Sequence, residues 1–336
     1  MRVLLVGPMI GEVGNHLYGF MNGLLKNGSR AEAINYLELD ITKNPFKKNH
    51  PAKLEKLRNR RLMNFINQFE PDIIIFCLHN LIFDLKLIKE EFNGLIIFMD
   101  VQGTDWKLFD NMEFWINDIN LLLTVSKRKM YELHEFGYTH TMFFYPGIDT
   151  DYYHPKQLNN CDLSYYGSPI SFVGRPSIKR VDYLENIVDL GLVVWGKKWN
   201  LHHEVANSDL RACQRSKVDV EGLELNRVCS ATNVLVNIHH DDSEKKIPSL
   251  TFKDFIAPSA ECCMLTEHMD EIEDLFDIGT EVITFANKDD FIYKAEKFSK
   301  DKDLANKIGR NARIRCLSQH SHEVKARELI NFLSDS

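Results

Sequence analysis

The sequence lacks the cysteine and histidine spacings that form metal sites. Its seven cysteines are scattered without a CxxC pair, and its thirteen histidines show no HExxH or CxxC…HxxxH pattern. An odd, scattered set of cysteines argues against a disulfide framework and is typical of reduced thiols in a reducing compartment. We therefore expect no metal site and a cytoplasmic location.

Long apolar runs are also missing. The longest, such as Ile73–Leu78 and Leu95–Met99, have the length of a strand, whereas a membrane-spanning helix needs roughly 20 apolar residues. The start, MRVLLVGPM, has a short apolar run interrupted by a Gly-Pro pair, so we expect no secretory signal. The net charge of −7 argues against a general nucleic-acid binder.

Short apolar runs alternate with amphipathic segments along the 336 residues. Runs such as Arg2–Val6 and Leu192–Trp195 read as buried parallel strands, and segments such as Ala52–Phe69 and Asp289–Lys300 read as helices. This alternation predicts an α/β protein built from two doubly wound sheets. The expected domains are residues 1–150 and 151–320, followed by a helix at 321–336 that can pack back on the first domain.

The segments that follow predicted strands are candidate sites, because ligands of open α/β sheets bind beyond the carboxyl ends of the strands. One of them, Gly7–His16, is a strand-to-helix loop with Gly11 and Gly14, where backbone N–H groups can approach a phosphate. It lacks the strict GxGxxG pattern of dinucleotide sites, and a tight turn without a ligand remains the alternative. Another, Asp100–Trp106, carries Asp100 and Asp105, and Asp105 can equally cap a helix.

Basic residues gather in two places. The first lies after the predicted strand Ser171–Val173, where Gly174 is followed by Arg175, Lys179 and Arg180. These residues can form an anion site, and the alternative is a solvated basic turn. The segment Thr42–Arg61 holds eight Lys or Arg residues against one Glu. This asymmetry suggests an anionic partner, such as a glycan, a nucleic acid or a membrane surface, unless it is the polar face of a surface helix. The residues concerned include Lys43, Lys47, Lys48, Arg58, Arg60 and Arg61.

Three segments together resemble a known family. Tyr145–Pro155, YPGIDTDYYHP, resembles the domain-junction signature of retaining glycosyltransferases with the GT-B fold. Phe172–Leu184 is similar to their F-V-G-R-x-x-x-x-K-G-x-x-x-L segment. Lys253–Phe285 resembles the spore-maturation, CgeB-like branch of these enzymes. This last segment shares with that branch Asp254, Phe255, Pro258, Leu265, Thr266, Glu267, Phe276, Gly279, Glu281 and Phe285.

The resemblance implies two Rossmann-like domains that face a central cleft. It implies a glycosyltransferase that moves a sugar, with retention, from a nucleotide-diphosphate donor linked to UDP or GDP. No metal and no further cofactor are expected, because basic side chains would stabilise the departing diphosphate. In the family pattern the diphosphate is clamped by Arg175 together with Lys179 or Arg180. The resemblance further assigns Gly174, Asp254, Thr266 and Glu267 to the donor, and Gly11, Gly14, His16, Asp100 and Asp105 to the cleft and the acceptor.

The sequence departs from the family pattern at three positions. The family's ribose-binding Glu is Ile256 here, a nearby Gly is Glu261, and another Glu is Pro248. An isoleucine cannot accept hydrogen bonds from a ribose diol, so Asp254, Glu261 or Glu267 would have to substitute. The alternatives are a degenerate GT-B protein that binds a sugar or a partner without catalysis, and a sugar-nucleotide epimerase with the same fold.

Overall fold

The computed structural model describes residues 1–9, 11–39, 51–77, 83–100, 115–201, 209–239 and 250–335. The chain forms two compact units. The first contains Met1–Gly147 and His322–Ser336, and the second contains Ile148–Ser321.

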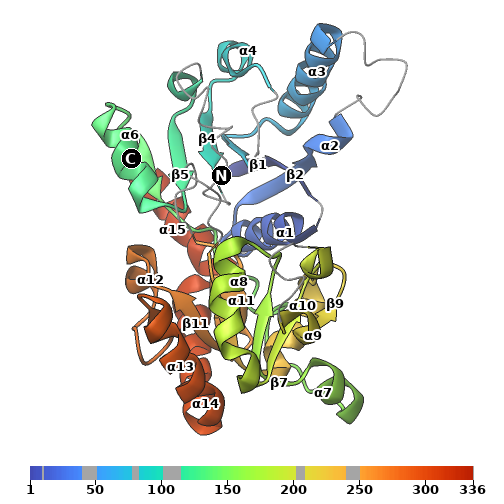
Figure 1. Cartoon of the computed structure of the whole chain (residues 1–336). Coiled ribbons are helices and arrows are strands. Elements are labelled where there is room, and N and C mark those ends of the chain that lie inside the picture. Colours follow the sequence, from blue (N-terminus) through green and yellow to red (C-terminus); the bar gives the residue numbers. More distant parts are fainter. Residues whose placement is uncertain are drawn as a thin grey trace. The chain divides into compact units, whose positions relative to one another are not determined.

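The first unit is built on a six-stranded parallel sheet with the order β2-β1-β3-β4-β5-β6. Figure 1 labels four of these strands, β1, β2, β4 and β5. The order reverses between β1 and β3, which is the switch point of a doubly wound sheet. The inner strands are short apolar runs, and β3 is buried along its whole length. The strands are β1 (Arg2–Gly7), β2 (Arg30–Asn35), β3 (Ile73–Phe76), β4 (Leu95–Met99), β5 (Leu121–Thr124) and β6 (Thr141–Phe143).

Helices connect these strands, and the last helix of the chain returns to this unit. Ser126 and Asp84 cap α6 and α4 by accepting hydrogen bonds from backbone N–H groups of the first turn. Helix α15 packs against α1, and a Cβ at Gly23 would overlap the carbonyl of His322, so this close approach requires glycine. The helices are α1 (Gly11–Lys26), α2 (Tyr36–Leu39), α3 (Pro51–Phe69), α4 (Leu85–Glu91), α6 (Lys127–Glu135) and α15 (His322–Asp335).

The second unit has its own six-stranded parallel sheet, with the order β12-β11-β10-β7-β8-β9. Counted from β7, this is the 3-2-1-4-5-6 order of the Rossmann fold, and its switch point lies between β7 and β10. The strands are β7 (Ser168–Val173), β8 (Leu192–Trp195), β9 (Gln214–Ser216), β10 (Thr232–Asn237), β11 (Cys263–Glu267) and β12 (Ile283–Phe285). The helices that matter below are α8 (Ile178–Leu184), α10 (Gly222–Ala231), α11 (Lys253–Ser259), α13 (Lys288–Lys300) and α14 (Lys302–Arg315).

The prediction of an α/β protein with two doubly wound parallel sheets is confirmed. Three local predictions were wrong. Helix α1 begins at Gly11 and not at His16, so most of the predicted glycine loop is the first turn of the helix. The sequence pattern of Ala33–Leu39 predicts a strand, but these residues form the end of β2 and the short helix α2. Strand β9 was missed because its sequence, QRS, has no apolar residue.

The segment Tyr145–Pro155 forms the turn by which the chain enters the second unit. Gly147 has φ 93°, a left-handed conformation that favours glycine. The carboxylate of Asp149 accepts hydrogen bonds from the backbone N–H groups of Asp151 and Tyr152, at 3.0 and 2.9 Å. Tyr153 is buried, and its carbonyl accepts the hydroxyl of Ser259 at 2.5 Å. The signature is thus a turn anchored to the second unit.

Glu261 occupies a position where glycine is expected on physical grounds. It has φ 60° and follows α11, where Cys262 N donates to Ala257 O and Glu261 N donates to Pro258 O. These two bonds form a Schellman motif, whose left-handed residue is usually glycine. Glu261 gains in exchange a half-exposed ion pair with Arg313, with 3.7 Å between Oε1 and Nε.

We predict that Glu261→Gly stabilises the second unit by about 0.5–1 kcal/mol, because the left-handed strain outweighs the weak ion pair. Urea denaturation of both proteins measures the difference. Glu261→Ala is the matched control, since alanine keeps the strain and loses the ion pair. Equal stability of the Gly and Ala variants would contradict the argument.

Candidate functional site

Arg180 ties together the two loops at the switch point of the second unit. Its side chain is 7% exposed, and it donates from Nη1 to Arg175 O and from Nε to Ile238 O, both at 3.0 Å. The guanidinium also lies 5.4 Å from the centre of the Phe172 ring. These contacts join the loop after β7 to the loop after β10, so Arg180 holds the two loops in place.

Lys253 also supports the end of β7. It is half-buried, and its Nζ donates to Val173 O at 2.9 Å and lies 5.7 Å from the Phe172 ring centre. Burial lowers the pKa of Lys253 to about 7, and the charge of Arg180 acts in the same direction. Two basic side chains therefore flank the aromatic ring at the end of β7.

Asp254 is the centre of a buried polar network. It is 0% exposed, and its Oδ2 accepts from Thr251 N at 2.7 Å and Thr251 Oγ1 at 2.9 Å. Its Oδ1 accepts from Asn237 Nδ2 at 2.6 Å and from Thr266 Oγ1 at 3.3 Å. The network joins β10, α11 and β11, so Asp254 and Thr266 position these elements and lie beneath the surface of the site.

His239 completes this network. Its Nε2 lies 3.8 Å from Asp254 Oδ1 and 3.4 Å from Thr266 Oγ1. Burial lowers the pKa of His239, and the carboxylates of Asp254 and Glu267 oppose this shift. The ring contributes to the packing at the end of β10.

Lys179 and Glu267 form an ion pair at the same edge of the sheet. Ser177 caps α8, which sets Lys179 in the first turn of that helix, and Glu267 ends β11. The Lys179 Nζ to Glu267 Oε1 distance is 2.6 Å, and the two side chains are 22% and 25% exposed. The second carboxylate oxygen of Glu267 is buried and has no hydrogen-bond partner in the described part of the chain. The pair thus offers an accessible cation and an acceptor with spare capacity.

A second cation cluster surrounds Asp219. Its Oδ2 lies 2.9 Å from Arg175 Nη2 and 2.5 Å from Lys197 Nζ. The hydrogen bond from Arg175 lowers the pKa of Asp219, the bond from Lys197 adds to this, and burial opposes it. Arg175, Lys197 and Asp219 follow β7, β8 and β9, so neighbouring strand ends bring them together.

Two glycines let the loops of this edge approach each other. Gly174 and Gly196 have φ 153° and 136°, and a Cβ at Gly196 would overlap the carbonyl of Gly174. The same carbonyl accepts the indole N–H of Trp199 at 2.8 Å. A side chain at Gly196 would therefore separate the loops that carry Arg175 and Lys197.

The sequence prediction named several members of this site and missed others. Of the two candidate basic residues in α8, Lys179 is accessible, whereas Arg180 is buried and binds backbone carbonyls. Lys197 lies in Gly196–Trp199, one of the segments that follow predicted strands and are candidate sites, but no role was predicted for it. Asp219 was missed, because it follows the polar strand β9, which gave no signal.

The candidates of the first unit lie at the carboxyl ends of its strands or in α1. Gly11 begins α1 with φ 64°, and a Cβ at Gly14 would lie 2.5 Å from Met9 C. Asp100 follows β4, is buried, and accepts from Thr124 Oγ1 at 3.4 Å. Asp105 lies outside the described residues.

His16 packs inside the first unit against His322. Their ring centres are 5.7 Å apart in an edge-to-face arrangement, and His322 Nδ1 lies 2.8 Å from Pro146 O. Burial lowers the pKa of His322 to about 3, and the nearby His16 acts in the same direction. His16 is therefore a packing residue between α1 and α15 in this structure.

The basic segment is described only in its helical part. Arg60 and Arg61 on α3 are exposed, and Arg58 is half-buried with its guanidinium 5.9 Å from the centre of the Phe83 ring. Lys43, Lys47, Lys48 and the position of Pro248 lie outside the described residues.

Over the described residues, no group of three His, Cys, Asp or Glu side chains is arranged to hold a metal ion. The described helices are all too short or too polar to cross a lipid bilayer.

Comparisons with known proteins agree with the fold. Sucrose-phosphate synthase from Thermosynechococcus elongatus has a TM-score of 0.69 at 10% identity, over 100% of this chain and 98% of that one. HepE of Anabaena, solved with UDP, has a TM-score of 0.68 at 11% identity over 100% of both chains. HepE was also solved with UDP and glucose and with UDP-glucose.

A putative UDP-N-acetylglucosamine 2-epimerase from Listeria monocytogenes is also similar in structure. Its TM-score is 0.62 at 10% identity, over 100% of this chain and 97% of that one. No curated protein matches the chain in sequence. Residues 178–331 match the family described as glycosyl transferase-like. The chain thus has the fold of GT-B glycosyltransferases, and the part that carries Lys179, Asp254 and Glu267 matches a glycosyl transferase-like family.

Proposed function

We propose that the protein transfers a sugar, with retention, from a nucleoside-diphosphate sugar to an acceptor. The observation that carries this proposal is the gathering of Arg175, Lys179 and Lys197 at the carboxyl edge of the second sheet. Asp219 and Glu267 hold these cations in ion pairs, and Glu221 also acts on Arg175, so a diphosphate would bind by replacing Asp219 and Glu267 as the partner of Arg175 and Lys179. The match of residues 178–331 to a glycosyl transferase-like family supports the same function.

In this reaction the bond between the sugar C1 and the diphosphate oxygen breaks, and its electron pair stays on the diphosphate. A new bond forms between C1 and the acceptor oxygen on the same face of the sugar. The acceptor proton passes to the departing phosphate oxygen, so the protein needs no general base for this step. Lys179 and Arg175 stabilise the charge that develops on the diphosphate.

Glu267 is the proposed acceptor for hydroxyl groups of the donor. Ile256, which stands at the family's ribose-binding position, is 1% exposed and belongs to the core. Asp254 is occupied by its buried network, and Glu261 is engaged at the end of α11. The Glu267 side chain is 25% exposed, and one of its carboxylate oxygens has no partner in the described part of the chain. That oxygen is buried, so the carboxylate has to rotate to accept a hydrogen bond from a donor hydroxyl.

A panel of nucleotide sugars with mass-spectrometric detection of the released nucleoside diphosphate tests the proposal. We expect at least one UDP- or GDP-linked sugar to be turned over and to raise the melting temperature. If no donor is turned over but one binds, the protein is a degenerate GT-B binding module. A changed sugar nucleotide without acceptor would instead identify an epimerase, which the similarity to the Listeria protein makes a specific alternative.

Arg175→Ala and Asp219→Asn are predicted to act in opposite directions. Loss of the Arg175 guanidinium is expected to lower kcat/KM at least about tenfold, because a charge stabiliser of the diphosphate is removed. Asp219→Asn removes the carboxylate that competes for Arg175 and Lys197, so UDP or GDP should bind about three- to tenfold more tightly. Calorimetric titration and steady-state kinetics measure these effects, with Arg310→Ala as an exposed control. Equal affinities of all variants for UDP or GDP would show that Arg175 does not bind the diphosphate.

The acceptor and the location complete the proposal. We propose an anionic acceptor because of the exposed Arg60 and Arg61 and the basic residues that precede them in sequence. A reducing cytoplasm fits the seven cysteines, each of which is a free thiol. The CgeB-like branch is proposed from the shared residues of Lys253–Phe285.

A further inference from the structure

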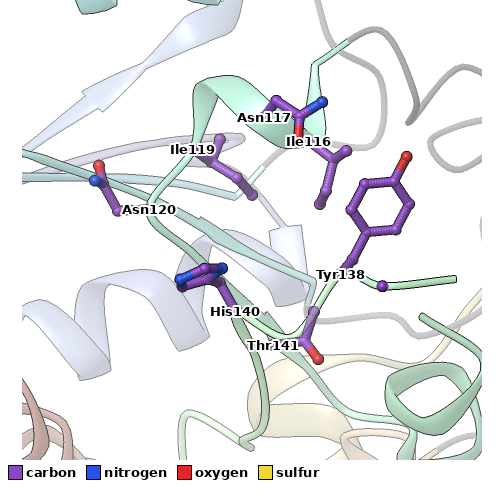
Figure 2. Close-up of a pocket in the computed structure, with 8 residues that line it drawn as sticks. Ile116, Asn117, Ile119, Asn120, Tyr138, His140 and Thr141 are labelled. Carbon is purple, nitrogen blue, oxygen red and sulfur yellow. The ribbon is translucent and has the colours of Figure 1, made fainter. Parts of the chain in front are cut away.

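A pocket of about 350 Å³ lies in the first unit, away from the carboxyl edge of its sheet. Its walls come from two segments, one that leads into β5 and one that leads into β6 (Figure 2). It therefore sits at the amino-terminal edge of the sheet. The lining side chains used below are Ile116, Asn117, Asn120, Tyr138, His140 and Thr141.

The position separates this pocket from the candidates at the other edge of the same sheet. Asn120 immediately precedes β5, whereas Thr124 at the far end of that strand binds Asp100. A four-residue strand spans roughly 13 Å, so a small molecule in the pocket cannot reach the loops at the carboxyl edge. The pocket is thus a site of its own.

The lining selects a particular ligand chemistry. The pocket residues offer two amides, an imidazole, a hydroxyl group and a phenol, and none of them is Asp, Glu, Lys or Arg. Ile116, Ile119 and the ring of Tyr138 add an apolar surface. Amides beside an aromatic ring, without ionised groups, suit a neutral molecule with several hydroxyls and an apolar face.

Backbone and side-chain contacts hold this lining in place. Asn120 Oδ1 accepts from Ile96 N at 2.8 Å, and Thr141 Oγ1 is 2.6 Å from His134 Nε2. Asn117 O accepts Lys89 Nζ at 2.7 Å, and His140 O accepts Leu122 N at 2.9 Å. In the described residues, the Asn117 and His140 side chains make no hydrogen bond of their own, so both can turn to a ligand.

We propose that this pocket binds a neutral saccharide, independently of the donor site in the second unit. Asn117 and His140 supply hydrogen bonds to the sugar hydroxyls, and the ring of Tyr138 packs against the apolar face of the sugar. The proposal rests on the lining of the pocket and not on the proposed transfer reaction. A failure of one is therefore distinguishable from a failure of the other.

Saturation-transfer NMR on the full chain tests this site. The probes are glucose, N-acetylglucosamine and maltose, with glucuronate, glucosamine and uridine for comparison. We expect at least one neutral sugar to bind, and the double variant Asn117→Ala, His140→Ala to weaken it at least about fivefold. Tyr131→Ala, an exposed residue of α6 outside the pocket, is the control and should bind as the wild type does.

Addition of UDP separates the two sites. A neutral sugar bound in this pocket keeps its signal when UDP saturates the second unit. The proposal is overturned if no neutral sugar binds, if charged sugars or uridine bind equally well, if UDP abolishes the signal, or if the double variant binds as tightly as the wild type.

Discussion

Replacement of Asp254 by alanine is expected to destabilise the second unit by about 3–5 kcal/mol. The substitution leaves the hydrogen-bond donors of Asn237, Thr251 and Thr266 without their acceptor, and Asn237 and Thr266 are fully buried. Each buried donor that loses its acceptor costs about 1–3 kcal/mol, and a cavity adds to this cost. Urea denaturation followed by tryptophan emission measures the loss, because Trp195 and Trp199 are buried in this unit.

Two further variants define this effect. Asp254→Asn keeps the shape of the side chain but turns an amide N–H toward one of the donors. Its free energy of unfolding should therefore lie between those of Asp254→Ala and the wild type. Asp303→Ala, at an exposed position of α14, should change stability by less than about 0.5 kcal/mol. If Asp254→Ala is no less stable than Asp303→Ala, the buried network does not hold β10, α11 and β11 together.

Replacement of Lys179 by alanine is expected to lower the rate of sugar transfer by about 10²–10³-fold. Its ammonium group is the accessible cation of α8, and the structure pairs it with Glu267 at 2.6 Å. Loss of this charge leaves the developing diphosphate less stabilised while the fold remains intact. The rate of nucleotide release at saturating donor measures the effect.

Lys179→Arg should recover part of the activity, because it restores a positive charge with a different geometry. Lys307→Ala, an exposed lysine of α14, is the matched control and should keep full activity. If Lys179→Ala has a near-normal rate, residues other than Lys179 stabilise the diphosphate. A variant that is inactive because it is unfolded would be recognised by its lost melting transition.

Much of the fold follows from local patterns in the sequence. Strand β8 has the predicted bounds, Leu192–Trp195, because its apolar run ends at Gly196. The helix predicted at Ala52–Phe69 begins only one residue earlier, at Pro51. Strand β9 shows the opposite case. Its three polar residues form a strand only because β8 offers an edge to pair with, and no local pattern carries that information.

The site at the carboxyl edge of the second sheet was predicted less completely, because the sequence does not distinguish the environments of the neighbouring cations Lys179 and Arg180. Lys179 and Arg180 are both cations in one helix, and successive residues of a helix point about 100° apart. Arg180 therefore faces Phe172 and two carbonyls, while Lys179 faces the surface. The buried role of Asp254 depends on partners 3 to 17 residues away, which only the folded chain brings together.

A crystal structure with the nucleotide sugar that is turned over tests the central claim most directly. The account predicts diphosphate oxygens within hydrogen-bond distance of Lys179 Nζ and the Arg175 guanidinium, with Asp219 no longer bound to Arg175. A diphosphate bound elsewhere, with the Lys179–Glu267 and Arg175–Asp219 pairs both intact, would contradict it.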